Sequence, residues 1–227
     1  MNRPFVFINV AMTVDGKIDT FQRRGAAISS QRDKERVDRL RADADAVMVG
    51  GRTLLDEDPK LTVKSEELRL ERVSRGLSRN PIKVGVVTQA TLKADSHFLN
   101  EGPADIVIFT TRRTSKRYLS LLTSRRVDVY VDEAEKVDLQ RALATLKDLG
   151  IQRLMVEGGA RLNFELMRLG LVDEVTAFIA PMIFGGESAP TMAAGPGLER
   201  SAAIPLKLIE VEHWEGGGVV LKYHFER

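Results

Sequence analysis

The sequence predicts an α/β fold with a mixed, mainly parallel sheet flanked by helices and an antiparallel hairpin at its C-terminal end. Short runs of β-branched and apolar residues alternate with segments of helical periodicity along most of the chain, a pattern typical of a parallel sheet covered on both faces. The alternation stops near the end, where the strand-like runs 206–214 and 219–225 flank three consecutive glycines. Two strands joined by so short a glycine-rich turn indicate an antiparallel hairpin.

The strands before the hairpin are expected at seven short apolar runs. These runs are 5–10, 46–49, 82–87, 106–109, 127–131, 154–156 and 175–179. Each is bounded by polar or glycine-containing segments, as buried strands usually are.

The helices are expected between these strands, with identifiable start and stop residues. Ser30 is expected to cap a helix whose apolar face carries Val37, Leu40 and Ala44. A second helix is expected at 115–124, a third from a cap at Asp138 to a stop at Gly150, and a fourth at 160–169 before Gly170. The charged segment 65–80 lacks a clear apolar stripe and is expected to be a partly helical surface excursion.

Composition narrows the class of protein. The 227 residues fit a single domain over 1–227, and 43% hydrophobic with 29% charged residues is ordinary for a soluble globular protein. With no cysteine and three scattered histidines, disulfides, thiol nucleophiles and a metal site are not expected. A net charge of +2 and 6% aromatic residues argue against nucleic-acid binding. The basic clusters at 69–79 and 112–117 are therefore interpreted as solvated surface.

The chain carries no apolar run of membrane-spanning length and no secretory leader pattern. A cytoplasmic protein with no membrane partner is therefore expected.

Two glycine pairs are the most informative local features. Gly50-Gly51 follows the run 47–49, and Gly158-Gly159 follows 154–157 and opens a helical pattern. Glycines at a strand end let backbone N–H groups approach a ligand, and a helix start beyond them favours a phosphate. Two such turns predict a nucleotide cleft. The Gly-x-Gly-x-x-Gly and Walker patterns are absent, so a nucleotide would bind in another way.

An ordered set of motifs over about residues 5–225 resembles the riboflavin-biosynthesis reductases. The set comprises Asn-Val-Ala-Met-Thr-Val-Asp-Gly-Lys-Ile at 9–18, Ile28-Ser29-Ser30, Arg41-Ala42, Val49-Gly50 with Thr53, Asp58-Pro59, Leu61-Thr62-Val63, Glu157-Gly158-Gly159 with Leu162-Asn163, Gly170-Leu171-Val172-Asp173-Glu174, and Ala180-Pro181 with Phe184-Gly185-Gly186.

This resemblance implies a dihydrofolate-reductase-like fold, a homodimer, and reduction of a ribosylamino side chain to ribitylamino on a pyrimidine phosphate by NADPH. No zinc-deaminase motif accompanies the match. The chain is therefore most similar to the free-standing archaeal type, which acts on 2,5-diamino-6-ribosylamino-4(3H)-pyrimidinone 5′-phosphate before deamination.

The resemblance also implies which residues contact the cofactor. They are Thr53, Glu57, Thr88, Gln89, Gly158, Gly159, Ala160 and Arg161. Glu57 stands where the family usually has Asp, and Thr88-Gln89 stands where it usually has Asp-Ser, so the preference for NADPH over NADH stays open. Arg161 could face the 2′-phosphate, because arginine binds phosphate in a bidentate way, or be a solvated helix residue.

The substrate side is expected to use Asn9, Asp15, Lys17, Gly25, Arg41, Lys64 and Glu157. Lys17, Asp15 and Glu157 are the candidate catalytic residues, and on an extended stretch Asp15 and Lys17 would point the same way, toward a polyol.

The remaining candidates have plainer alternatives. Arg41 and Lys64 suit a 5′-phosphate, although Arg41 could instead pair with Asp38 or Asp45. Glu157 would accept from pyrimidine amino groups or anchor a helix start, and Asp15-Gly16 reads equally as a plain turn.

Three other functions remain open on the sequence: reduction of the deaminated pyrimidine, another dihydrofolate-reductase-like enzyme acting on a pterin or carbonyl, and a nucleotide-binding regulatory domain without turnover.

Overall fold

The computed structural model describes residues 2–226 and confirms the α/β fold with a mixed, mainly parallel arrangement of strands. The chain divides into two compact units. Unit 1 contains the chain up to Phe5 and Val37–Met155, and unit 2 contains Val6–Arg36 and the chain from Val156 onward.

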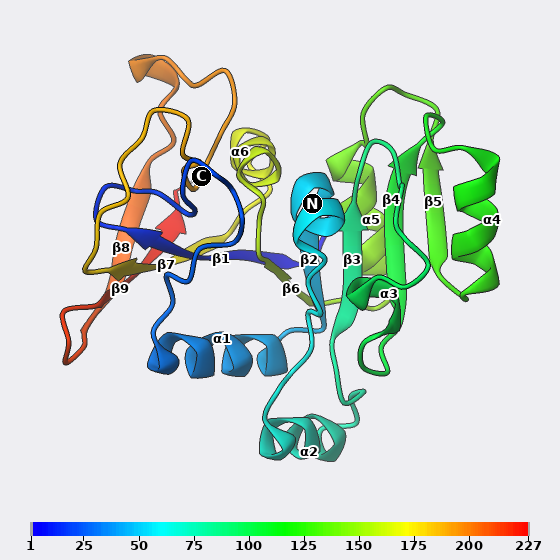
Figure 1. The fold of residues 1–227 in the computed structure, drawn as a ribbon, viewed down its shortest axis with the longest axis horizontal. Coiled ribbons are helices and arrows are strands. Elements are labelled where there is room, and N and C mark those ends of the chain that lie inside the picture. The colour runs from blue at the N-terminus through cyan, green and yellow to red at the C-terminus, as the bar shows by residue number, and fades with distance from the viewer. Residues whose placement is uncertain (1, 227) are drawn as a thin grey trace. The chain divides into compact units, whose positions relative to one another are not determined.

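Unit 1 has the strand order β5-β4-β3-β2-β6. The pairs β2–β3, β3–β4 and β4–β5 are parallel, and β5 to β2 lie side by side in Figure 1. Their bounds are β2 Ala46–Gly50, β3 Ile82–Val86, β4 Ile106–Thr111, β5 Asp128–Asp132 and β6 Arg153–Val156. All five residues of β2 are buried. An Ala-Val-Met-Val-Gly strand without alternation suits a position covered on both faces.

Unit 1 contains the helices α2 Glu66–Ser74, α3 His97–Asn100, α4 Lys116–Ser124 and α5 Leu139–Asp148, together with a π-helix, η1, at Thr53–Glu57. Helices α4 and α5 lie where the sequence predicts them, whereas α3 and η1 were not predicted. The Asp138 carboxylate accepts the backbone N–H groups of Gln140 and Arg141, which confirms the expected cap of α5. Gly150, with φ of +90°, follows the end of that helix, as expected of a C-terminal glycine.

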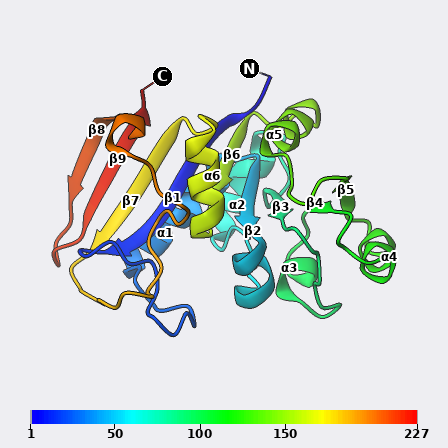
Figure 2. The ribbon, with the colours of Figure 1, turned by 90° about the horizontal axis from the view of Figure 1, so that it is seen from above.

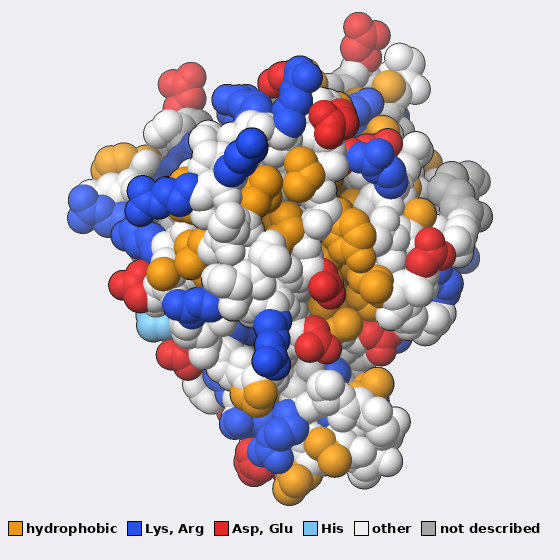
Figure 3. Space-filling model, turned by 90° about the vertical axis from the view of Figure 1, so that its right-hand side faces the viewer, with side chains coloured by type: hydrophobic (Ala, Val, Ile, Leu, Met, Phe, Trp, Pro, Cys, Tyr) orange, Lys and Arg blue, Asp and Glu red, His pale blue; other side chains and the backbone are white. Residues whose placement is uncertain are grey.

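The segment 65–80 is partly helical, as predicted, but it is not wholly a surface excursion. Ser65 caps α2 by accepting the Leu68 N–H, and the helix packs through Leu68 and Arg72. Only 2% of Arg72 is exposed, so the interpretation of this basic cluster as wholly solvated is wrong. Figure 3 shows the side of unit 1 that carries α4 and β5, where basic and acidic side chains are interspersed around hydrophobic ones.

Lys83, on β3, is a second buried cation of unit 1. Its ammonium donates to the backbone carbonyls of Phe98 (3.0 Å) and Glu101 (2.5 Å). Burial lowers the pKa of Lys83 to about 8, against the opposing charges of Glu101 and Asp58.

Unit 2 has the strand order β1-β7-β9-β8, with the hairpin beside β7 in Figure 2. The strands are β1 Phe5–Thr13, β7 Glu174–Ala180, β8 Leu206–His213 and β9 Val219–Phe225. β1 and β7 are parallel, with Asn9 opposite Thr176, whereas β9 is antiparallel to both β7 and β8. The expected C-terminal hairpin is thus confirmed, with a bulge between Leu208 and Glu210.

Two helices complete the frame of unit 2. Helix α6 spans Ala160–Arg168, and α1 spans Gln31–Asp43, with Arg36 its last residue in this unit. The Ser30 hydroxyl accepts the Asp33 N–H at 3.2 Å, which confirms the expected cap of α1. A short 3-10 turn, η2, lies at Arg200–Ala202. Over residues 2–226, no helix combines the length and apolar character needed to span a bilayer.

Candidate functional site

A hollow of about 390 Å³ lies in unit 1, at the carboxyl ends of β2, β3 and β4. Its volume falls in the range of small-molecule sites. It is lined by Gly51, Arg52, Leu55, Asp56, Val87, Thr88, Gln89, Thr91 and Arg113. Thr88 and Gln89 were expected at a cofactor site from the sequence, whereas Arg52, Asp56 and Arg113 were not.

The π-helix η1 forms one wall of this hollow and depends on two close approaches. A Cβ on Gly51 would meet the Val87 Cγ2 atom at 3.1 Å, and a Cβ on Gly85 would meet the Leu54 Cδ2 atom at 2.8 Å. These glycines therefore let η1 pack directly on β3. Within η1 the Thr53 hydroxyl donates to Glu57 Oε1 at 3.1 Å, so two predicted cofactor residues are in contact. π-helical turns are rare and occur frequently at functional sites.

Buried threonines at the end of β4 and just after it fix another wall of the hollow. The Thr111 hydroxyl donates to the Thr88 carbonyl at 2.7 Å, and the Thr114 hydroxyl accepts the Ala90 N–H at 2.8 Å. The Arg113 N–H donates to Thr111 Oγ1 at 3.3 Å, which places Arg113 on the same turn. Sequence reasoning missed Arg113 as a lining residue of the hollow, because Arg113 belongs to a basic cluster that resembles ordinary surface.

Arg41 and Lys64 also lie in unit 1. Arg41 Nη1 donates to the Thr62 carbonyl at 3.1 Å. The carboxylate of Asp38 accepts the N–H groups of Lys64 and Ser65, at 2.6 and 2.7 Å. Asp45 accepts those of Gln152 and Arg153, both at 2.8 Å. Both aspartates thus bind backbone N–H groups, a role that the sequence did not suggest.

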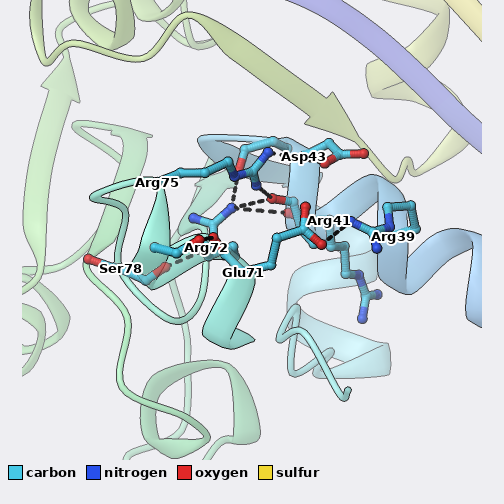
Figure 4. A network of polar contacts seen from close by, with 10 residues as sticks. Arg39, Arg41, Asp43, Glu71, Arg72, Arg75 and Ser78 are labelled. Carbon is cyan, nitrogen blue, oxygen red and sulfur yellow. Dashed lines mark hydrogen bonds and ion pairs between the residues drawn. The ribbon is translucent and has the colours of Figure 1, made fainter. Parts of the chain in front are cut away.

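Arg72 closes the C-terminal end of α1, as Figure 4 shows. Its guanidinium donates to the carbonyls of Ala42 (2.9 Å), Ala44 (2.6 Å) and Ser78 (2.8 Å), and lies 3.4 Å from the Arg41 carbonyl. Arg75 adds a second donor to Ala42, at 2.6 Å. The orphan carbonyls that end a helix are therefore satisfied here by arginine side chains.

In unit 2, Asp15 and Lys17 lie on a turn and not on the extended stretch considered from the sequence. β1 ends at Thr13, Gly16 has φ of +76°, and the Thr13 N–H donates to the Lys17 carbonyl at 2.9 Å. This is the plain-turn alternative for Asp15-Gly16. The Lys17 ammonium donates to the Ala189 carbonyl at 3.3 Å.

The Asp15 carboxylate is occupied by neighbours within unit 2. It accepts the Thr13 hydroxyl at 2.5 Å and the N–H groups of Gly185 and Phe184 at 2.7 and 3.3 Å. The hydrogen bond from the Thr13 hydroxyl is the main cause that lowers the pKa of Asp15. Desolvation opposes this effect, and the hydrogen bonds from the Gly185 and Phe184 N–H groups add to the lowering. Asp15 therefore holds the Phe184-Gly185 turn beside Lys17.

Asn9 and Gly25 lie elsewhere in unit 2. Asn9 is 8% exposed on β1, and its Oδ1 atom has no hydrogen-bond donor among residues 2–226. Gly25, with φ of +77°, donates its N–H to Asp19 at 2.9 Å. Asp19, which also accepts from Thr20 and Ala26, organises this loop and was missed by sequence reasoning.

The second glycine turn leads into α6, as expected. Glu157 follows β6 and is partly buried, and Gly158 has φ of +99°, a conformation that favours glycine. Gly159 caps α6, Ala160 begins it, and Arg161 is exposed on its first turn.

The segment 192–194 is fixed to this helix start by two hydrogen bonds. Asn163 donates its side-chain N–H to the Met192 carbonyl at 2.9 Å, and the Ala194 N–H donates to the Ala160 carbonyl at 3.0 Å. The two glycine turns belong to different units, so a cleft shared by both stays a prediction.

Comparison with known proteins identifies the family. The RibD C-terminal domain model matches residues 4–222. The chain is 40% identical over 207 residues to a 2,5-diamino-6-ribosylamino-4(3H)-pyrimidinone 5′-phosphate reductase of Methanothermobacter thermautotrophicus, with 91% of each chain covered.

Solved structures agree on the fold. A pyrimidine reductase-like protein of Corynebacterium diphtheriae has a TM-score of 0.84 at 20% identity, with 100% of this chain and 93% of that chain covered. Dihydrofolate reductase of Enterococcus faecalis has a TM-score of 0.51 at 10% identity, with 98% and 97% covered, which confirms the expected dihydrofolate-reductase-like fold. With its match over nearly the whole length, this chain belongs to the RibD C-terminal domain family.

Proposed function

We propose that this chain reduces the ribosylamino side chain of 2,5-diamino-6-ribosylamino-4(3H)-pyrimidinone 5′-phosphate to ribitylamino, with NADPH, in riboflavin biosynthesis. Its relatives of 38–40% identity carry the name of this reductase. The structural observation that carries the proposal is the hollow of unit 1, which Thr88 and Gln89 line together with the η1 residues Leu55 and Asp56. Family resemblance assigns Thr88 and Gln89 to the cofactor, and also Thr53 and Glu57, which belong to η1 and contact each other but are not among the lining residues.

The hollow fits the phosphorylated end of NADPH. Arg52 and Arg113 bring two positive charges, and Asp56, whose carboxylate lies 4.0 Å from the Arg52 guanidinium, brings one negative charge. The excess positive charge suits a 2′-phosphate and has no equivalent use for the 2′-hydroxyl of NADH. NADPH is therefore the favoured cofactor. Arg113, and not Arg161, is proposed as the arginine that faces the 2′-phosphate.

The residues of the substrate side have chemically distinct tasks. Arg41 and Lys64 bind the 5′-phosphate, Glu157 accepts from the amino groups of the pyrimidine, and Lys17 donates to hydroxyls of the open-chain sugar. Asp15 contributes by holding the turn beside Lys17. Asn9 and Gly25 are retained as contacts to the substrate, Asn9 because its buried oxygen has no donor in the part of the chain that the structure describes.

The reaction is a two-electron reduction of the open-chain imine of the ribosylamine. When bound, NADPH would supply a hydride for C1′, and with a proton taken up from solvent by the adjacent nitrogen the C=N double bond would become a single bond. The protein aligns the two reactants and stabilises charge. Lys17 positions and polarises the sugar.

The assembly proposed for this enzyme is a homodimer, through the apolar face of the C-terminal hairpin. Leu206, Leu208, Ile209 and Val211 of β8 are between 40% and 48% exposed. In a dimer with a two-fold axis, this apolar surface of one subunit would be buried against the same surface of the other subunit. Light scattering at micromolar concentration should give twice the monomer mass, and a Leu208→Lys variant should give the monomer mass. A monomeric wild type would refute this assembly.

The test of the function is a turnover assay. Purified protein is mixed with NADPH or NADH and with either the diamino pyrimidine phosphate or its deaminated counterpart, and the absorbance of the reduced nicotinamide is followed. We expect fastest oxidation with NADPH and the diamino substrate. Cofactor binding without oxidation in all four mixtures would refute the function and favour a regulatory domain.

A further inference from the structure

The two cations proposed for the substrate phosphate, Arg41 and Lys64, lie on segments of unit 1 that are tied together by side chains with no assigned role. We propose that Asp38 and Arg72 are positioning residues that hold Arg41 and Lys64 in one fixed arrangement before the phosphate binds. The proposal rests on the proposed function for the role of the two cations.

Asp38 sets the backbone of Lys64. It is 7% exposed, and its two carboxylate oxygens accept the consecutive N–H groups of Lys64 and Ser65 at 2.6 and 2.7 Å. Two bonds from one carboxylate to neighbouring amides fix the orientation of that backbone as well as its position. Asp38 also lies three residues before Arg41 on α1, on the same side of the helix. The start of the Lys64 side chain is therefore fixed relative to the helix that carries Arg41.

Arg72 sets the end of the helix that carries Arg41. Its guanidinium spans the carbonyls of Ala42, Ala44 and Ser78 and approaches that of Arg41, so α2 is fastened to the last turn of α1 (Figure 4). Among the described residues, Arg72 forms no ion pair and uses its donors on backbone carbonyls.

Arg41 is itself connected to the Lys64 segment. Its Nη1 atom donates to the carbonyl of Thr62, two residues before Lys64. The Lys64 segment is thus connected to α1 at both ends. At its start, Asp38 and Arg41 of α1 form hydrogen bonds to the backbone of Lys64 and Thr62. The segment then continues into α2, where Arg72 forms hydrogen bonds to the end of α1.

Such an arrangement matters more for binding than for the chemical step. A doubly charged phosphate is bound best by cations that are already aligned, because less conformational freedom is then lost on binding. Positioning of the phosphate site gives the buried carboxylate and the buried guanidinium one common purpose.

The test is the Asp38→Asn variant, whose amide keeps one acceptor and turns an NH₂ group toward the second backbone N–H. We expect KM for the pyrimidine phosphate to rise about tenfold, since one charge-assisted bond is lost, with kcat within about twofold. The dephosphorylated riboside should be reduced equally well by both proteins. Asp43→Asn is the matched control, because Asp43 lies on the same helix, has a partly exposed side chain and pairs with Arg75.

Two further measurements separate this role from a general structural one. Because Asp38 acts through Lys64, the effects of Asp38→Asn and Lys64→Met on KM should be less than additive in the double variant. Calorimetric titration with ribose 5-phosphate reads the phosphate site without turnover, and binding should weaken about tenfold in Asp38→Asn, matching the rise in KM.

The outcomes are distinct. Equal losses on the phosphorylated and dephosphorylated substrates, or additive effects with Lys64→Met, would overturn the positioning role. A wild type that binds ribose 5-phosphate but does not turn over would refute the proposed function, and the titration of Asp38→Asn would still decide the positioning role. If Asp38→Asn does not fold, Arg72→Lys, which retains the charge and loses the planar fork, is measured in the same way, with the same selective loss expected.

Discussion

Replacing Arg72 by methionine should destabilise unit 1 by an amount that the contacts of Arg72 allow us to work out. Methionine fills similar space without donors. The Ala42 carbonyl keeps the donor from Arg75 at 2.6 Å, and the Arg41 carbonyl also accepts the Ala44 N–H at 3.3 Å. The carbonyls of Ala44 and Ser78 lose the side-chain donor that Arg72 gives them at 2.6 and 2.8 Å.

Each buried acceptor that loses its donor raises the free energy of the folded state by about 1–3 kcal/mol. The Ala44 carbonyl is buried, whereas Ser78 is exposed, so water can replace the donor that the Ser78 carbonyl loses. The loss at Ala44, partly offset because a buried guanidinium no longer has to be desolvated, gives a net destabilisation of roughly 1–3 kcal/mol. For a chain of this size that corresponds to a fall in Tm of roughly 2–10 °C.

Urea unfolding of wild type and variant, followed by circular dichroism at pH 7, measures the difference in the free energy of unfolding. Arg75→Met is the control, since Arg75 is 40% exposed and the Ala42 carbonyl keeps the donor from Arg72; its effect should stay below about 1 kcal/mol. A change within about 0.5 kcal/mol of wild type for Arg72→Met would refute this reasoning.

Three further predictions concern cofactor choice, the substrate and pH. Arg113→Ala should weaken NADPH binding at least about tenfold and leave NADH binding unchanged in fluorescence titrations, because only the 2′-phosphate uses that charge; if Arg161→Ala has this effect instead, the phosphate site is misplaced. Lys17→Met should lower kcat/KM for the pyrimidine phosphate by about 10²-fold or more with NADPH affinity within about threefold, and near-normal turnover would make Lys17 a surface residue. Because the pKa of Lys83 is lowered from 10.5 to about 8, between these values the unfolded chain holds a proton that the folded chain has released. The free energy of unfolding of wild type relative to Lys83→Met should therefore rise with pH in this window, by up to about 1.4 kcal/mol per pH unit, and parallel urea profiles of the two proteins from pH 8 to 10 would contradict this.

Local signals predicted the frame of the fold well. The caps at Ser30 and Asp138 and the hairpin around Gly216 depend on residues close in sequence, and the structure has them where expected. The strand positions follow likewise from short apolar runs, with boundaries shifted by a few residues at most.

The features that sequence reasoning did not predict depend on contacts between residues far apart in the sequence. Arg72 sits among charged neighbours, and nothing local reveals that carbonyls about thirty residues earlier on α1 will bury it. The π-helical turn η1 is made possible by Gly51 and Gly85, one of which lies on another strand. For Arg113 the relevant signal is the flanking pair Thr111 and Thr114, whose hydroxyls face backbone groups after β3. Side chains that bind backbone groups far away in the sequence produce no periodic pattern from which they could be predicted.

The bulge in β8 bears on how this protein behaves when concentrated or freshly synthesised. β8 ends the strand order of unit 2, so its outer backbone groups can template another strand, and its apolar side chains add to that hazard. The irregularity at Ile209 interrupts the straight run of amides, and Lys207, Glu210 and Glu212 place charges along it. Straightening β8 by deleting Ile209 would therefore favour open-ended aggregation over closed pairing, and the yield of protein that stays in solution would fall.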